Sequence, residues 1–297
     1  MLDFKLIKSI GKGAITFIPG SNYFLAKKKK KSRHSGSDAL FSYSLWLSNM
    51  VYLSEHRIKP DYTRLVEIGN GGALGIAFCA ILTGTSKYFS FEHNQNINYK
   101  EQIELLESIS LLFDKSEPIH HYERVNIRIS DHSYPENKVL PKTQRKRLVK
   151  QLKQDLHNKL IGSDLIFLVQ NWEIQNPLNI TFAFSRAVME HVNDPNYIYH
   201  KVFSHLLAGA FMLHDIEFHS HGITTKINDH FKIQLPIWKI IRGKRAFYLN
   251  RFKPVDHINS MTNCGFKNLK SDIVYENSKP NEKEIYGAVM IAQKMAD

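Results

Sequence analysis

The chain has 297 residues, enough for one large α/β domain with additions or for two small domains. Apolar residues make up 43% of it and aromatic residues 11%, which supports a substantial core. No apolar run comes near the 18 residues of a membrane-spanning helix, so that class is not expected. The net charge of +12 suits nucleic acid, an anionic membrane surface or an anionic substrate, and does not distinguish among them.

The first residues lack the apolar stretch of a signal peptide, and the only cysteines are Cys79 and Cys264. We therefore expect a cytoplasmic protein without a disulfide framework. A basic run covers Lys27–Lys31 and is either a solvated loop or a segment drawn to an anionic membrane or a phosphate-bearing acceptor. A helix is expected from about Ala39 to His56, capped by the serine or aspartate just before it.

The most informative stretch begins at Arg64 and reads RLVEIGNGGALG. An apolar strand leads into a turn at Gly69 and Gly71, where the backbone can bend tightly and approach a ligand. A helix is expected next, followed by a second strand, Lys87–Phe91, that ends at Glu92. This order is typical of a site for a ribose-containing cofactor, in which the carboxylate accepts hydrogen bonds from the ribose hydroxyls.

The spacing of the glycines bears on which cofactor is bound. The dinucleotide fingerprint is G-x-G-x-x-G, but Leu74 stands where its third glycine should be. Glu67 precedes the first glycine by two positions, and this E-x-G-x-G arrangement resembles the first motif of the class I S-adenosylmethionine (SAM) methyltransferases. SAM carries a cationic sulfonium and no phosphate. The resemblance implies that Glu67, Gly69, Gly71 and Glu92 contact SAM, and the alternative is a glycine turn in another α/β protein.

An amphipathic helix is expected over residues 99–113, and regularity then lapses. Residues 114–163 are too many for a simple connection between strands, so we expect an insertion after the second strand. It carries a basic helix from about Lys142 to Leu160, whose charged side is either solvated or takes part in acceptor binding. This side lacks a recognisable nucleic-acid-binding module, so nucleic acid is not the expected partner.

Three more strands are expected at Asp164–Val169, Asn179–Phe184 and Ala210–His214, with a helix that begins at Asp194 before the last of them. Two apolar stretches in the tail, 273–275 and 287–292, are candidates for the final strands, although the second could equally form a helix. Further cofactor-binding candidates stand near the ends of these strands: Asn171, Trp172 and Ser185.

Several segments resemble a narrower group, the methyltransferases encoded among bacterial surface-polysaccharide genes. The resemblance extends from about residue 10 to about residue 266 and is carried mainly by these segments: Thr16–Gly20, Tyr43–Leu47, His214–Gly222, Trp238–Arg245 and Leu249–Arg251. It implies an α/β fold with a Rossmann-like, seven-stranded, mostly parallel sheet and helices on both faces. Residues 1–60 would then be a helical N-terminal extension and residues 61–297 the SAM-binding domain.

This resemblance also implies a sugar or glycan acceptor. Methyl transfer to a sugar hydroxyl needs an in-line arrangement of oxygen, methyl carbon and sulfur, and is helped by a group that removes the hydroxyl proton. Histidine suits the second task near neutral pH. His191 follows the fourth expected strand and His221 follows the fifth, so both belong to the carboxyl edge of the sheet, where ligands bind. We rank these two first as catalytic bases, and either could instead be a structural histidine.

A divalent metal is a further hypothesis. Glu190 and His191 resemble part of the metal-binding E-x-x-E-H motif of some RNA 2′-O-methyltransferases, but Ala187 replaces the first acid. Residues after the fifth strand could complete a site with mixed oxygen and nitrogen ligands, or could form an ordinary polar loop: Asp215, Glu217, His219 and His221. The sequence leaves metal dependence open.

The sequence thus predicts a SAM-dependent O-methyltransferase that acts on a sugar hydroxyl in the synthesis of a surface polysaccharide or other glycan. The acceptor could be nucleotide-linked or lipid-linked. The alternatives are an O-methyltransferase for RNA or another small molecule, a nicotinamide-dependent oxidoreductase, which the glycine spacing disfavours, and a non-catalytic protein with the SAM fold.

Overall fold

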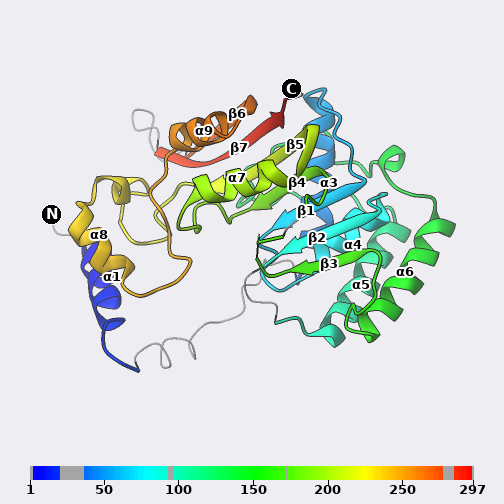
Figure 1. Ribbon diagram of the computed structural model, residues 1–297, viewed down its shortest axis with the longest axis horizontal. Helices are drawn as coiled ribbons and strands as arrows, with labels where there is room; N and C mark the ends of the chain where they lie inside the picture. Colours follow the sequence, from blue (N-terminus) through cyan, green and yellow to red (C-terminus); the bar gives the residue numbers. More distant parts are fainter. Residues whose placement is uncertain are drawn as a thin grey trace.

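The computed structural model describes residues 3–20, 37–92, 96–171, 173–174, 176–276 and 284–295. Within these ranges the strands are β1 (Arg64–Ile68), β2 (Lys87–Phe91), β3 (Ile166–Val169), β4 (Ile180–Arg186), β5 (Leu206–Glu217), β6 (Phe266–Glu276) and β7 (Glu284–Lys294). They form a single seven-stranded sheet in the order β3-β2-β1-β4-β5-β7-β6 (Figure 1).

The sheet is mixed: β1 to β5 pair in parallel with their neighbours, whereas β7 is antiparallel to both β5 and β6. This order differs from the doubly wound order 3-2-1-4-5-6 only by the insertion of β7 between β5 and β6. The chain leaves β1 toward β2 on one side, and β4 lies on the other side. The carboxyl ends of β1 and β4 therefore flank the switch point of the sheet, where α/β proteins bind ligands.

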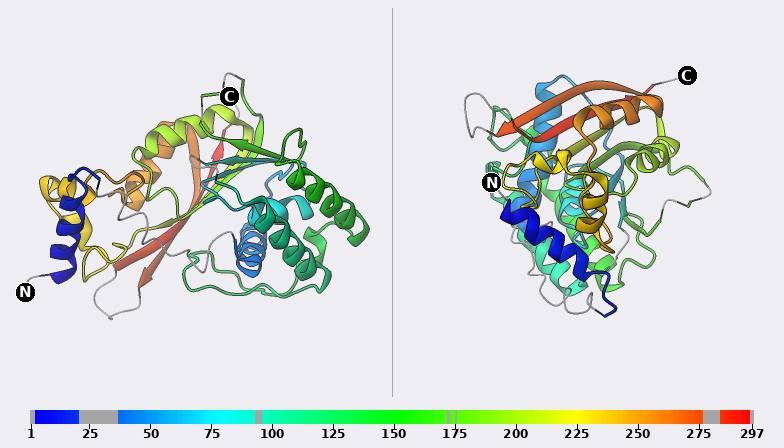
Figure 2. Two further views of the ribbon diagram at one scale, coloured as in Figure 1. Left: turned by 90° about the horizontal axis from the view of Figure 1, so that it is seen from below. Right: turned by 90° about the vertical axis from the view of Figure 1, so that its left-hand side faces the viewer.

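Helices cover both faces of the sheet (Figures 1 and 2). One face carries α3 (Ala39–Glu55), α4 (Gly75–Leu82), α5 (Tyr99–Asp114) and α6 (Lys142–His157), and the other carries α7 (Pro195–His205) and α9 (Pro254–Asn263). The alternation along β1 explains the two layers. Leu65 packs into the core with α3 and α4, whereas Val66 and Ile68 pack into the core with α7 and α9.

A third, smaller core joins α1 (Phe4–Ile15) to α8 (Leu235–Arg242) at the end of the molecule beyond the carboxyl edge of the sheet (Figure 1). The two helices approach so closely at Gly13 that a Cβ added there would lie 2.0 Å from the carbonyl oxygen of Ile240. Asp3 caps α1 and also accepts a hydrogen bond from the N–H of Thr225 at 2.8 Å. The start of α1 is therefore hydrogen-bonded to the segment after β5.

Most of the predicted elements are confirmed. Asp38 is the cap of α3, and its side chain accepts from the N–H of Phe41 at 2.9 Å. Asp194 caps α7 as expected, with Pro195 in the first turn. The stretch 287–292 lies in a strand, because β7 fills the gap between β5 and β6 and is buried on both faces.

The helices α1, α8 and α9 were not predicted, and the basic run Lys27–Lys31 lies outside the described residues. The irregular residues that follow α5 include only a single 3-10 turn, Glu136–Lys138, before α6 begins. The boundary near residue 60 stays a prediction, although α3 shares a core with the sheet. In the described parts of the chain, no helix is long and apolar enough to cross a membrane.

Candidate active site

The glycine turn after β1 is held against the end of β2. Gly69 and Gly71 have φ angles of +76° and +63°, a conformation that glycine adopts at little cost. The N–H of Gly69 donates to the carbonyl of Phe91 at 2.7 Å, and the N–H of Gly71 donates to Oε2 of Glu92 at 2.9 Å. These bonds fix the predicted carboxylate beside the turn.

A cavity of about 630 Å³, called here the first cavity, opens at this point. Five predicted residues line it: Gly69, Gly71, Glu92, Asn171 and His191. Its other walls are largely apolar and include Ile68, Phe91, Val188, Ile198 and Phe247. A cavity of this size with apolar walls and a few polar groups at its edge suits a nucleoside, whose base packs against apolar side chains while its ribose meets a carboxylate.

Two predicted cofactor contacts are not among the residues that line the first cavity. Glu67 points into the core beside α4, where the hydroxyl of Tyr88 donates to its carboxylate. Burial raises the pKa of Glu67 to about 8. Ser185 is also fully buried, 2.8 Å from Nδ1 of His214, whose pKa burial lowers to about 3. Trp172, the remaining prediction, lies outside the described residues.

Replacing Glu67 by glutamine tests whether this acid is buried in the core with a raised pKa. The folded-state pKa of Glu67, about 8, lies above the unfolded value of about 4.3. Its contribution to stability is therefore complete below pH 4.3 and is lost as the pH rises through 8. Between pH 5 and pH 8 we expect the wild-type free energy of unfolding to fall by about 3 kcal/mol more than that of Glu67→Gln. Urea unfolding at both pH values measures this, and an unchanged pH slope would contradict the burial of the acid.

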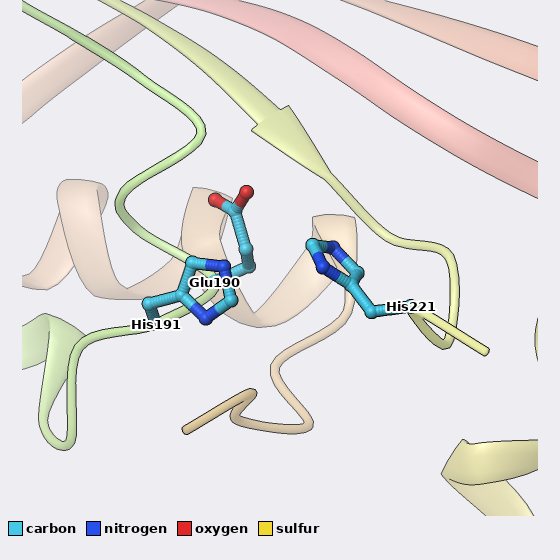
Figure 3. A group of neighbouring side chains, drawn as sticks. All are labelled: Glu190, His191 and His221. Atoms are coloured by element: carbon cyan, nitrogen blue, oxygen red, sulfur yellow. The ribbon is translucent and has the colours of Figure 1, made fainter. Parts of the chain in front are cut away.

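The two predicted catalytic histidines come together although they belong to different loops. The rings of His191, after β4, and His221, after β5, lie 5.1 Å apart and almost perpendicular. The carboxylate of Glu190 faces the same space (Figure 3), and one ligand atom from each of the three side chains lies within 4.8 Å of the others. His221 has a φ of +50°, a strained conformation of the kind that concentrates at functional sites.

Charged groups surround this cluster. Nε2 of His219 and of His221 lie 2.9 and 3.3 Å from Oε2 of Glu217. Burial alone would raise the pKa of Glu217, but these hydrogen bonds outweigh it and hold that pKa well below its usual range. Burial raises the pKa of Asp215 to about 6, against the opposing effects of Arg186 and Asn126. Oδ1 of Asp215 accepts a hydrogen bond from Nδ2 of Asn126 at 2.5 Å. Asp215 does not belong to either of the groups whose side chains could hold a metal ion, which are Glu190 with His191 and His221, and Glu217 with His219 and His221.

A second cavity, of about 590 Å³, adjoins the first and shares Val192 and Asn193 with it. Its wall includes the aromatic rings of Trp238 and Tyr248 from α8 and the segment that follows it. Cationic and amide side chains also line it, Arg242, Arg251, Asn250 and Asn259, together with one acid, Asp256. The guanidinium of Arg251 lies over the Trp238 ring, 5.3 Å from its centroid. The cavity therefore combines flat apolar surfaces with hydrogen-bond donors and positive charge.

Several residues of this region were not singled out from the sequence. The sequence marked parts of the segment from Trp238 to Arg251 only as carriers of the family resemblance and indicated no role for them in binding. Asn126 and Arg186 contact the acids at the end of β5, and neither belongs to a recognisable motif. Asn126 sits in the irregular segment after α5, and only the fold brings it to β5. Arg186 ends a buried strand, where a cation beside acidic residues of the next strand was the one available clue.

No family model matches the chain, and no curated protein matches it either. Solved structures do resemble it, among them a SAM-dependent methyltransferase from Methanosarcina mazei that is 16% identical in sequence. The alignment covers 82% of this chain and 98% of that protein's chain, with a TM-score of 0.45. Another, from Mesorhizobium loti, is 10% identical and covers 83% of this chain and 97% of its own with a TM-score of 0.43. The cyclase SpnF is also 10% identical, with coverages of 84% and 81% and a TM-score of 0.42.

Proposed function

We propose that the chain is a SAM-dependent O-methyltransferase, with SAM in the first cavity. The observation that carries this proposal is the geometry of the turn: Glu92 is fixed beside Gly71 at the edge of a largely apolar cavity. The adenosine of SAM would pack against the apolar walls, and its ribose hydroxyls would donate to the Glu92 carboxylate. Asn171, two residues after β3, would supply a further polar contact.

The start of α4 argues against a dinucleotide. A pyrophosphate is held by backbone N–H groups at the start of the helix that follows the glycine turn. Here Leu74 is fully buried at that point, and its N–H donates to Oε1 of Gln102 at 2.9 Å. That donor is therefore already used, whereas SAM, which has no phosphate, does not need it.

The reaction is an in-line displacement. The acceptor oxygen would attack the methyl carbon, the carbon–sulfur bond would break with its electron pair moving to sulfur, and the hydroxyl proton would pass to a nearby imidazole. The cationic sulfonium becomes a neutral thioether, so the leaving group is good and positioning supplies much of the rate. His191 is a wall residue of the first cavity, and His221 lies against it. The proton would therefore be released at this end of the cavity.

The second cavity is the proposed acceptor site. Its shared wall with the first cavity would bring an acceptor hydroxyl toward the methyl group. The C–H face of a sugar ring can pack on Trp238 and Tyr248, while amide and guanidinium groups donate to its oxygens. The arginines further favour an acceptor that carries a phosphate, as nucleotide-linked and lipid-linked sugars do. A role in surface-polysaccharide synthesis is part of this proposal.

The first test is calorimetric titration with S-adenosylhomocysteine, with NADH as the control ligand. We expect S-adenosylhomocysteine to bind and Glu92→Ala to weaken that binding 10- to 100-fold, because two charge-assisted hydrogen bonds are lost. The matched control is Glu104→Ala, an exposed acid of α5, which should bind like the wild type. A preference for NADH, or equal binding by both variants, would refute the assignment.

The acceptor is tested separately, with SAM labelled at its methyl carbon. We expect label to reach nucleotide-linked or lipid-linked sugars. Transfer to RNA with a steep salt dependence would instead favour an RNA methyltransferase. Binding of S-adenosylhomocysteine without transfer to any of these acceptors would favour a non-catalytic protein.

A further inference from the structure

We infer that Glu190, His191 and His221 bind a divalent transition-metal ion at the boundary between the loops after β4 and β5. The three side chains converge on one space (Figure 3), with a ligand atom from each within 4.8 Å of the other two. Bonds of about 2.1 Å to a metal would require ligand atoms about 3 Å apart. Small side-chain rotations would therefore close the group around an ion.

The state of Glu190 is an independent reason to expect a cation here. Its side chain is 2% exposed, and within the described residues neither carboxylate oxygen accepts a hydrogen bond. Buried carboxylates are normally paired, hydrogen-bonded or coordinated to a metal, because desolvation without compensation is costly. A bound cation would give Glu190 the partner that its own fold does not supply.

The surrounding charge points the same way. Two further acids lie close to this group, Asp215 and Glu217, and the guanidinium of Arg186 lies 3.9 Å from Asp215 and 3.6 Å from Glu217. A divalent cation would offset the negative charge of these carboxylates. Glu217 would remain outside the metal's ligands and orient His221 through its hydrogen bond, as carboxylates behind metal-bound histidines do.

The donor set indicates the kind of ion. Two imidazoles and one carboxylate suit manganese, iron, cobalt or zinc better than calcium or magnesium, which prefer oxygen ligands. Three protein ligands also leave coordination positions open. An open position would bind the acceptor hydroxyl of the proposed function and lower its pKa, so that its proton leaves to water. His191 and His221 would then act as ligands rather than as bases.

Metal binding is tested without SAM. Chelator-treated protein is titrated with Mn²⁺, followed by the loss of the free-ion signal in electron paramagnetic resonance, and with Co²⁺, followed by visible absorption. We expect one site per chain, and at least tenfold weaker binding for Glu190→Gln and for His221→Asn. His200→Asn, an exposed histidine of α7, is the matched control and should bind like the wild type.

A second group, Glu217, His219 and His221, shares one histidine with the first, so His219→Asn separates the two. If His219→Asn abolishes binding while Glu190→Gln binds normally, the inference is wrong and the ion belongs to the second group. No binding of Mn²⁺, Co²⁺ or Zn²⁺ by the wild type would also overturn it. Binding of S-adenosylhomocysteine in excess chelator is measured in parallel, so that failure of the metal site and failure of the proposed function give different results.

Discussion

Replacing Gly69 by alanine is expected to destabilise the protein by about 3 kcal/mol, the sum of a left-handed conformation and an overpacked contact. Gly69 has a φ of +76°, and a Cβ added to it would lie 2.6 Å from Cγ2 of Val188. Both residues line the first cavity, so their separation would also widen the proposed cofactor site. We therefore expect Gly69→Ala to weaken binding of S-adenosylhomocysteine at least tenfold, measured by calorimetry on the fraction that remains folded.

A double-mutant cycle separates the two causes. In a Val188→Ala background the clash is gone and only the backbone strain of about 1 to 2 kcal/mol should remain. Gly71→Ala is the matched control: its φ is +63°, but no atom lies within 4 Å of the added Cβ. If Gly69→Ala costs as much in the Val188→Ala background as in the wild type, steric contact with Val188 does not explain the glycine.

Replacing Gly13 by alanine is expected to separate α1 from α8. In a helix interior, alanine is ordinarily more stable than glycine by about 0.5 to 1 kcal/mol. At Gly13 the added Cβ would lie 2.0 and 2.4 Å from the carbonyl oxygens of Ile240 and Ile241, which belong to the backbone and cannot rotate away. We expect the sign to reverse, with a loss of about 2 kcal/mol or more.

The control for this prediction lies on the same helix. Gly11 has no atom within 4 Å of an added Cβ, so Gly11→Ala should leave the protein as stable as the wild type or slightly more stable. Hydrogen exchange measured by mass spectrometry reports on each helix. Gly13→Ala should speed exchange in α1 and α8 and leave β1 and α4 unchanged. Equal exchange in the two variants would show that α1 does not depend on close contact at Gly13.

The parts of this structure that could be predicted were those encoded by local patterns. The apolar run of β1, the glycine turn and the cap at Asp194 each act within a few residues, and the structure has them where expected. Glu67 shows that a motif leaves the direction of a side chain open. Its spacing from the glycines suggests a cofactor contact, but alternation along β1 places it on the face of Leu65, toward α4. The period of the strand was the better guide.

The candidate site was only partly predictable because its residues meet through the fold. His191 and His221 were candidates separately, and their contact depends on the parallel pairing of β4 with β5. Helices α1 and α8 were missed for a physical reason: α1 contains two glycines and α8 has only eight residues, so neither is a strong helix by itself. Each is stabilised by packing against the other.

That mutual dependence has a consequence for how the protein is made. The bond between Asp3 and Thr225 joins residues 222 positions apart, so α1 leaves the ribosome long before α8 exists. At 5 to 20 residues per second, its apolar side must wait on the order of 10 to 40 s for its partner. Because α8 forms a wall of the second cavity, the proposed acceptor site is completed only when the first and last thirds of the chain finally meet.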